Sequence, residues 1–316
     1  MSAPIEFSPS RRAGSIRRTS HIDILLGTDG LVLDGGARDL VTSLDGSQVT
    51  DEAHVHAVVG PDRRLRELAT TPARHATEGL LGCSVGGGFR DAIKHALPEE
   101  VSAGTALALL LDDLPVAALI SGYAMLFSGG LSVRSGQAPK EDICSGWRSE
   151  GTMMESVRAD QGVPVTIGPA APSIAGDAAI DPLGWHALGD LPIGAMRRRR
   201  LIDVTDGECW QINAMFRDTH VDADGSETVL HEYSLIAEVD RETGRFTECS
   251  AIPRVLPWVE CPVAAASAWR LAGHHVNDVR QFVRADLRGT STCTHLNDLL
   301  RSLGDVNTLT TTLIAR

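Results

Sequence analysis

The chain has 316 residues, of which 43% are hydrophobic, 22% are charged and only 4% are aromatic. A chain of this length is expected to form about two domains, and its composition excludes a disordered protein, a collagen, a coiled coil and a disulfide-rich mini-protein. The net charge of -12 argues against nucleic acid or an anionic membrane as the main partner.

The N-terminal region shows no export signal. Residues 1–18 contain prolines and arginines but lack the continuous apolar stretch of a signal peptide. The most apolar segment, residues 105–127, is interrupted by Asp112, Asp113 and Pro115, which makes it a poor membrane-spanning helix. The six cysteines form no C-x-x-C pair, and such scattered thiols are typical of a reducing compartment. The sequence therefore predicts a cytoplasmic protein.

Two segments of the chain resemble each other. Residues 16–24 (IRRTSHIDI) align with residues 196–204 (MRRRRLIDV), and residues 45–47 align with residues 224–226. Further matches follow in the same order over about a hundred residues, the signature of an internal repeat. They predict a diverged first copy in residues 1–127, a connector in residues 128–194 and a second copy in residues 195–316. Two unrelated α+β domains with similar turns are the alternative.

The second copy predicts the elements of each half. Alternating residues indicate strands at 210–216, 228–240 and 245–252, which together form an antiparallel meander. Apolar residues with helical spacing then predict helices at 263–271, 276–287 and 296–303. We therefore expect an α+β fold of two related halves. Each half would be a three- or four-stranded meander followed by about three helices, and a pseudo-twofold axis would relate them.

The connector, residues 128–194, is rich in Gly, Pro, Ala and Ser, yet it contains Trp147 and Trp185. A solvated linker gains nothing from exposing indole rings. We expect this segment to pack across the halves and to line the principal pocket with one of these tryptophans.

His231 and Tyr233 form the first candidate site. They share the apolar face of the predicted strand at 228–240, because side chains two residues apart point the same way. A buried imidazole beside a phenol could act as general acid and base near neutral pH. The alternative is that both are structural residues whose polar atoms form local hydrogen bonds.

Cys293 and His295 form a second candidate site, at the start of the last predicted helix. A helix N-terminus lowers the pKa of a thiol, and Asp298 lies on the same helical face as His295 and could orient its ring. The spacing matches no zinc signature. The alternative is a small buried cysteine followed by a capping threonine.

Four consecutive arginines occupy positions 197–200. They could bind a carboxylate or phosphate on a substrate, but a solvated edge that pairs with the excess of acidic residues is the more common meaning of such a run, and we favour it. The glycine-rich segment at residues 82–88 follows a helical stretch and lacks the Lys-Ser/Thr ending of a P-loop, so it predicts no nucleotide site.

Several of these motifs occur in the same order in a bacterial family of uncharacterised proteins, which residues 140–305 resemble. The motifs are Cys144-Ser145-Gly146-Trp147, Gly184-Trp185-His186, residues 196–204, His231-Glu232-Tyr233, Cys261-Pro262 and Cys293-Thr294-His295-Leu296. This resemblance implies no activity. The terminal helices with a late cysteine are also similar to those of iron–sulfur cluster scaffold proteins, whose other cysteine ligands have no convincing counterparts here.

The sequence favours a cofactor-independent enzyme that acts by acid–base catalysis on a mostly apolar small molecule, as an isomerase, cyclase or lyase. The cleft between paired halves is the expected binding site. The predicted catalytic residues are His231, Tyr233, His186 and Asp203, and the predicted substrate-binding residues are Trp147, Trp185, Arg199 and Cys144.

Two alternatives stay open. One is a metal or iron–sulfur protein that uses Cys144, Cys261, Cys293 and His295. The other is a small-ligand-binding module without catalytic groups. We expect a small molecule as partner, and neither nucleic acid nor a membrane; whether the chain forms a homo-oligomer is left open.

Overall fold

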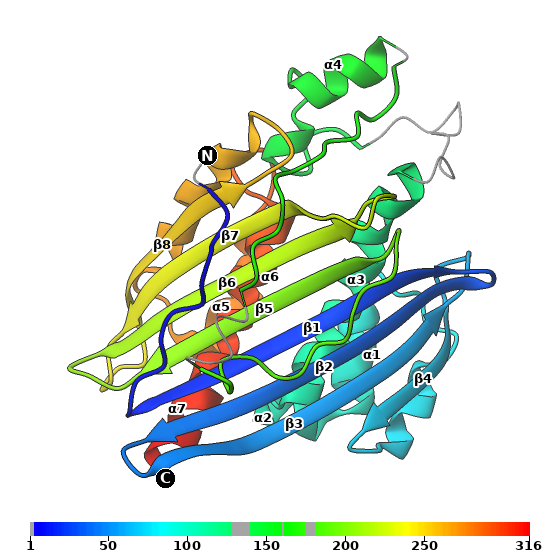
Figure 1. Cartoon of the computed structure of the whole chain (residues 1–316). Coiled ribbons are helices and arrows are strands. Elements are labelled where there is room, and N and C mark those ends of the chain that lie inside the picture. Colours follow the sequence, from blue (N-terminus) through cyan, green and yellow to red (C-terminus); the bar gives the residue numbers. More distant parts are fainter. Residues whose placement is uncertain (1–2, 128–139, 160, 175–180) are drawn as a thin grey trace.

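The computed structural model describes residues 3–127, 140–159, 161–174 and 181–316. Eight strands form one antiparallel sheet in the order β4-β3-β2-β1-β5-β6-β7-β8 (Figure 1). Their bounds are β1 Ser15–Gly27, β2 Gly30–Ser43, β3 Gly46–Val59, β4 Leu65–Thr71, β5 Met196–Thr205, β6 Trp210–Val221, β7 Glu227–Val239 and β8 Phe246–Val255.

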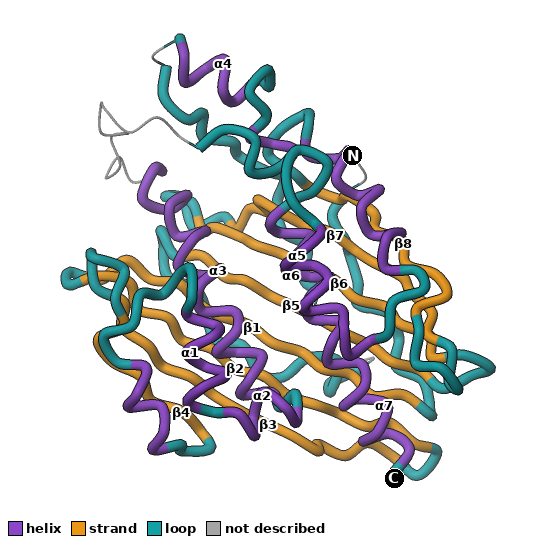
Figure 2. The backbone as a smooth tube through the Cα atoms, turned by 180° about the vertical axis from the view of Figure 1, so that it is seen from behind, coloured by secondary structure: helices purple, strands orange, loops and turns teal. Residues whose placement is uncertain are grey.

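The main helices all lie on one face of this sheet, seen from behind in Figure 2. They are η1 His75–Leu80, α1 Phe89–Ala96, α2 Pro98–Ala103, α3 Ala106–Phe127, η3 Cys261–Leu271, η4 Val276–Asp278, α5 Val279–Asp286, α6 Thr294–Ser302, η5 Leu303–Asp305 and α7 Val306–Ile314. Two short helices, η2 Ser145–Trp147 and α4 Thr152–Arg158, belong to the connector. The α+β prediction is confirmed.

The two halves of the sheet meet where β1 pairs with β5. Ile16 lies opposite Val204 and Ile24 lies opposite Met196. This register is the one expected if a twofold axis related residues 16–24 to residues 196–204. Four strands precede the helices in each half of the chain. The duplication and its pseudo-twofold axis stay predictions.

The three helices predicted in the second copy are present. Two of them start two residues earlier than predicted, and one is a 3-10 helix instead of an α-helix. The helix expected at 263–271 is a 3-10 helix that starts at Cys261, with proline in its first turn, and Gly273 at a φ of 85° follows its end. The helix expected at 276–287 begins as a 3-10 turn, in which the side chain of His275 accepts a hydrogen bond from the backbone N–H of Asn277. The last helix begins at Thr294, two residues before the predicted start.

Helix α3 is the one helix among the described residues that is long and apolar enough to span a membrane. It packs against β1, β2 and β3, and most of its residues are buried inside the protein. The acidic residue Asp113 in its middle forms an ion pair with Arg200, 2.7 Å away. These contacts are those of a core helix in a folded domain.

The sequence favours a solvated edge for the arginines at 197–200, and this prediction is wrong. Strand β5 lies in the centre of the sheet and is covered on both faces, so all four side chains are buried. On the helical face, Arg198 and Arg200 both bind Asp298, at 2.8 and 2.6 Å. On the opposite face, Arg197 binds Asp23 and Arg199 binds Glu227, at 2.5 and 2.8 Å.

The face of the sheet opposite the helices is partly covered by irregular chain. Residues 3–14 and 181–194 cross it, as Figure 1 shows. Trp185 is buried there, and its Nε1 donates a hydrogen bond of 2.7 Å to Ser8 Oγ. The described parts of the connector therefore pack against the sheet, whereas residues 128–139, 160 and 175–180 lie outside the described residues.

Candidate functional site

A mostly apolar pocket of about 520 Å³ lies beside the C-terminal end of α3. Its other walls come from the connector, the start of β7, the end of β8 and the start of α6. The lining residues include Leu119, Ile120, Tyr123, Leu126, Trp147, Ile167, Leu256 and Trp258. The connector thus contributes Trp147 to this pocket, as expected, whereas Trp185 lies on the opposite face of the sheet.

Two histidines and Tyr123 are the titratable groups that line this pocket. His231 comes from β7 and His295 from the first turn of α6, and both line the cavity. Their rings are stacked, with centroids 3.9 Å apart and an angle of 17° between the planes. His231 Nδ1 and His295 Nε2 are buried and have no hydrogen-bond partner among the described residues.

Asp218 lies behind these rings because β6 and β7 pair it directly with His231. Its Oδ2 is 3.6 Å from His231 Nδ1, and the side chain is fully buried. Arg198 holds the carboxylate through contacts of 2.9 and 3.0 Å. Burial nevertheless raises the pKa of Asp218 to about 6, against the opposing effect of Arg198.

Burial makes both histidines neutral at physiological pH. It lowers the pKa of His295 to about 3, and the charge of Arg198 adds to the effect. It also lowers the pKa of His231 well below its ordinary value, with further contributions from His295 and Arg198. A neutral imidazole can accept a proton, so the pocket contains two bases.

Tyr233 does not reach this pocket, although it shares a strand face with His231. It is fully buried among the helices, and its hydroxyl donates a hydrogen bond of 3.3 Å to the carbonyl of Cys261. Burial raises the pKa of Tyr233 far above its ordinary value, with Cys293 and Cys261 adding to the effect. Tyr233 therefore has the position expected of a structural residue whose polar atom forms a local hydrogen bond.

Three cysteines gather around Tyr233. Cys144, Cys261 and Cys293 come from the connector, η3 and the start of α6, and all three are buried free thiols. Cys293 Sγ lies 3.9 Å from His295 Nδ1. Burial raises the pKa of Cys293 to about 11, outweighing the backbone N–H groups of Leu296 and His295. The expected lowering of this pKa by the helix N-terminus is therefore wrong, because desolvation dominates.

The remaining predicted residues lie elsewhere. His186 contacts His21 on the sheet face opposite the helices, and Asp203 on that face forms an ion pair of 2.6 Å with Arg17. Neither lies beside His231. Arg199 is paired with Glu227 on the same face. Asp298 binds Arg198 and Arg200 and does not orient His295 as predicted.

Sequence reasoning missed Asp218, Tyr123 and Trp258. Asp218 had a usable signal, because the turn at residues 222–225 sets a hairpin whose register places Asp218 near His231. Tyr123 and Trp258 come from α3 and from the chain after β8, and no spacing in the sequence connects them to the histidines.

Asp218, His231 and His295 form a possible metal site, because one potential ligand atom of each lies within 4.8 Å of the others. A metal ion bound to an imidazole lies close to the ring plane. Two rings stacked with planes only 17° apart cannot both direct a lone pair at one ion unless one ring turns. The geometry fits a pair of bases better than a pair of ligands.

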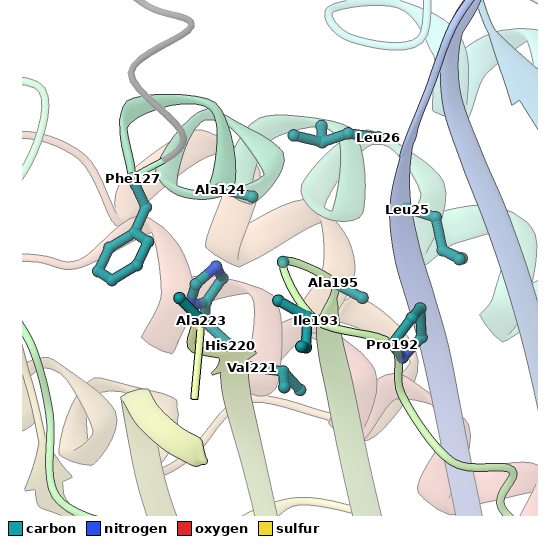
Figure 3. Close-up of a pocket in the computed structure, with 11 residues that line it drawn as sticks. Leu25, Leu26, Ala124, Phe127, Pro192, Ile193, Ala195, His220, Val221 and Ala223 are labelled. Atoms are coloured by element: carbon teal, nitrogen blue, oxygen red, sulfur yellow. The ribbon is translucent and has the colours of Figure 1, made fainter. Parts of the chain in front are cut away.

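A second pocket of about 530 Å³ lies on the other side of the α3 end. Figure 3 shows its apolar lining with one imidazole, that of His220. His220 Nδ1 contacts Asp222 Oδ1 at 2.9 Å, and its ring lies against Tyr123 and Phe127. With a single, already paired titratable group, this pocket offers less chemistry than the first.

Comparison with known proteins finds one family model that matches part of the chain. Residues 196–309 match DUF2889, described as a protein family of unknown function. The match spans β5 to α7 and includes His231, Cys261, Cys293 and His295. It confirms the predicted resemblance to an uncharacterised family, while leaving the N-terminal half outside the match. No curated protein and no solved structure matches the chain.

Proposed function

We propose that the protein is an enzyme that binds a mostly apolar small molecule in the pocket beside α3 and transfers a proton on it. His231 and His295 would be the general acid and base, in an isomerase, cyclase or lyase reaction. The observation that carries the proposal is the stacked pair of imidazole rings, with centroids 3.9 Å apart, on the wall of an apolar cavity. The six free cysteines favour a cytoplasmic location.

The proton would move between the substrate and one ring. A neutral imidazole nitrogen takes a proton from an acidic C–H, and the same proton returns to another carbon of the substrate. Negative charge that develops on the substrate raises the low resting pKa of the imidazole, because opposite charges attract strongly where water is excluded. Asp218, held by Arg198, lies beside His231 and stabilises the imidazolium.

Gly122 provides a test of the pocket. It lines the cavity, and a Cβ added there would meet no atom within 4 Å. Gly122→Leu should therefore fill the pocket without disturbing the fold, and leucine is also the better helix former. An uncharged apolar probe, N-phenyl-1-naphthylamine, should bind the native chain and lose at least tenfold in affinity to the variant. The control is Gly79→Leu, at an exposed glycine whose added Cβ also meets nothing. Equal affinities in all three proteins would contradict the proposal.

A second candidate function is a metal–thiolate centre that would use Cys144, Cys261 and Cys293, which surround Tyr233. Their sulfur atoms do not all lie within 4.8 Å of one another as the side chains stand, so metal binding would have to draw them together. The backbone N–H groups of Gly146, Trp147 and Thr294 approach Cys144 Sγ, an environment that supports a thiolate ligand although burial still raises the thiol pKa. Metal and sulfide analysis of protein purified without oxygen distinguishes the two. A stoichiometric metal that is lost in Cys293→Ser would favour this function; a metal-free protein would exclude it.

A further inference from the structure

A second group of histidines lies on the sheet face opposite the helices, far from the proposed catalytic pocket. His21 of β1, Gly36 of β2 and His54 of β3 lie side by side, because β1 pairs His21 with Gly36 and β3 pairs Gly36 with His54. The missing side chain at Gly36 lets the two rings approach over its backbone. A Cβ there would lie 2.9 Å from His21 Cε1 and 3.2 Å from His54 Nδ1.

The connector adds a third histidine, His186, which contacts His21. His21 Nδ1 lies 2.6 Å from His186 Nε2, and His186 Nδ1 lies 2.7 Å from Thr19 Oγ1. If His186 donates from Nδ1 to the threonine hydroxyl, its Nε2 accepts from His21 Nδ1–H. His21 then carries its lone pair on Nε2. Metal-binding histidines commonly have their other ring nitrogen held by such a partner, which fixes the tautomer.

The side chains around Gly36 line a small open pocket of about 290 Å³. His56 and Asp34 belong to the same wall, with His56 Nδ1 and Asp34 Oδ1 2.5 Å apart. As the rings stand, no three of these side chains bring their ligand atoms within 4.8 Å of one another. His54 and His56 are both about half exposed, so their rings can turn toward His21. The buried arginines Arg197 and Arg199 lie close enough to His21 to act on its charge. Asp23 and Glu227 pair with these two arginines and reduce their repulsion of a cation.

We propose that this cluster binds one divalent transition-metal ion of the zinc, nickel or copper type. His21 and His54 are the ligands on either side of Gly36, and His56 and Asp34 supply further donors from the rim. Neutral imidazole is a preferred ligand of these metals. His186 is a positioning residue that holds the tautomer of His21.

Isothermal titration of the full chain with Zn²⁺ at pH 7 tests the proposal, with Mg²⁺ as the ion that should not bind. One equivalent of Zn²⁺ should bind, and His54→Ala should weaken it at least tenfold. Because His54 is exposed, this change should leave the fold intact. Gly36→Ala, whose Cβ crowds both rings, should weaken binding too, and His75→Ala and His95→Ala at exposed histidines should not.

The same titration separates this site from those on the helical face. His231→Ala and Cys293→Ser should retain the equivalent of Zn²⁺ that His54→Ala loses. Unchanged binding in His54→Ala would overturn the proposal, as would loss of the ion in His231→Ala alone. Absence of any Zn²⁺ binding at millimolar concentration would also overturn it.

Discussion

His231 and His295 are held neutral by burial, and this has a consequence for stability in acid. In the unfolded chain an imidazole binds a proton near pH 6.5, whereas folded His295 does so only near pH 3. Between these values the unfolded state binds more protons, so the free energy of unfolding falls as pH falls. His21 and His186 act in the same direction, and Asp218, with its raised pKa, partly opposes them between pH 3.8 and about 6.

His295→Gln should therefore flatten the acid dependence of stability. Glutamine does not titrate, so the variant lacks the proton uptake of His295 in the unfolded state. Urea unfolding at pH 7 and pH 4.5 should show a smaller loss of unfolding free energy in the variant than in the native chain. His95→Gln, at an exposed histidine, is the control and should behave as the native chain. An unchanged difference between the two pH values in His295→Gln would contradict the burial-based account of its pKa.

Arg200 gives a second prediction for a single residue. Its guanidinium is fully buried and binds both Asp113 and Asp298. Arg200→Met would leave carboxylates without this partner in a site closed to water, and breaking a buried pair costs about 3–5 kcal/mol. Urea unfolding should show this loss, and Arg200→Met with Asp113→Leu should recover part of it. Full stability of Arg200→Met would show that the network does not hold β5 against the helices.

At the scale of elements, the hairpins and terminal helices could be predicted because they depend on local patterns. Alternation located β6, β7 and β8, and helical spacing located α5 and α6. The burial of the four arginines could not be predicted, because it depends on the pairing of β5 with β1, whose residues lie 172 to 190 positions away in the sequence. The pocket could be predicted only in part: Trp147 and His231 were named, while α3 supplies a wall that no motif marks.

Some residues of helix α3 pack in the core, and others line the pocket. Leu114 is fully buried, whereas Leu119 is 53% exposed and lines the pocket. Leu114→Ala should cost about 2–5 kcal/mol of stability by leaving a cavity. Leu119→Ala should change stability by less than about 0.5 kcal/mol but weaken binding of N-phenyl-1-naphthylamine. Urea unfolding and fluorescence titration measure the two effects. A large stability loss in Leu119→Ala would mean that α3 presents no free pocket face.

At the scale of the whole molecule, the two copies predicted from the sequence contribute their strands to one continuous sheet. The DUF2889 match begins at β5, in the middle of that sheet. Residues 195–316 alone would expose the long edge of β5. Arg197 would lose Asp23 of β1, and Arg200 would lose Asp113 of α3. We expect this fragment to aggregate or remain unfolded in size-exclusion chromatography and circular dichroism. A stable folded monomer would show that the second half is an independent domain.

The proposed reaction is a proton transfer by His231 and His295 on an apolar molecule bound beside α3. The most direct measurement is hydrogen–deuterium exchange in D₂O, followed by NMR, on the apolar ketone that best displaces N-phenyl-1-naphthylamine from the pocket. The native chain should accelerate exchange next to the carbonyl, and His231→Gln with His295→Gln should lower the rate by about 10²–10⁴-fold, while His95→Gln keeps it. Equal exchange rates in the native chain and the double variant would contradict the claim.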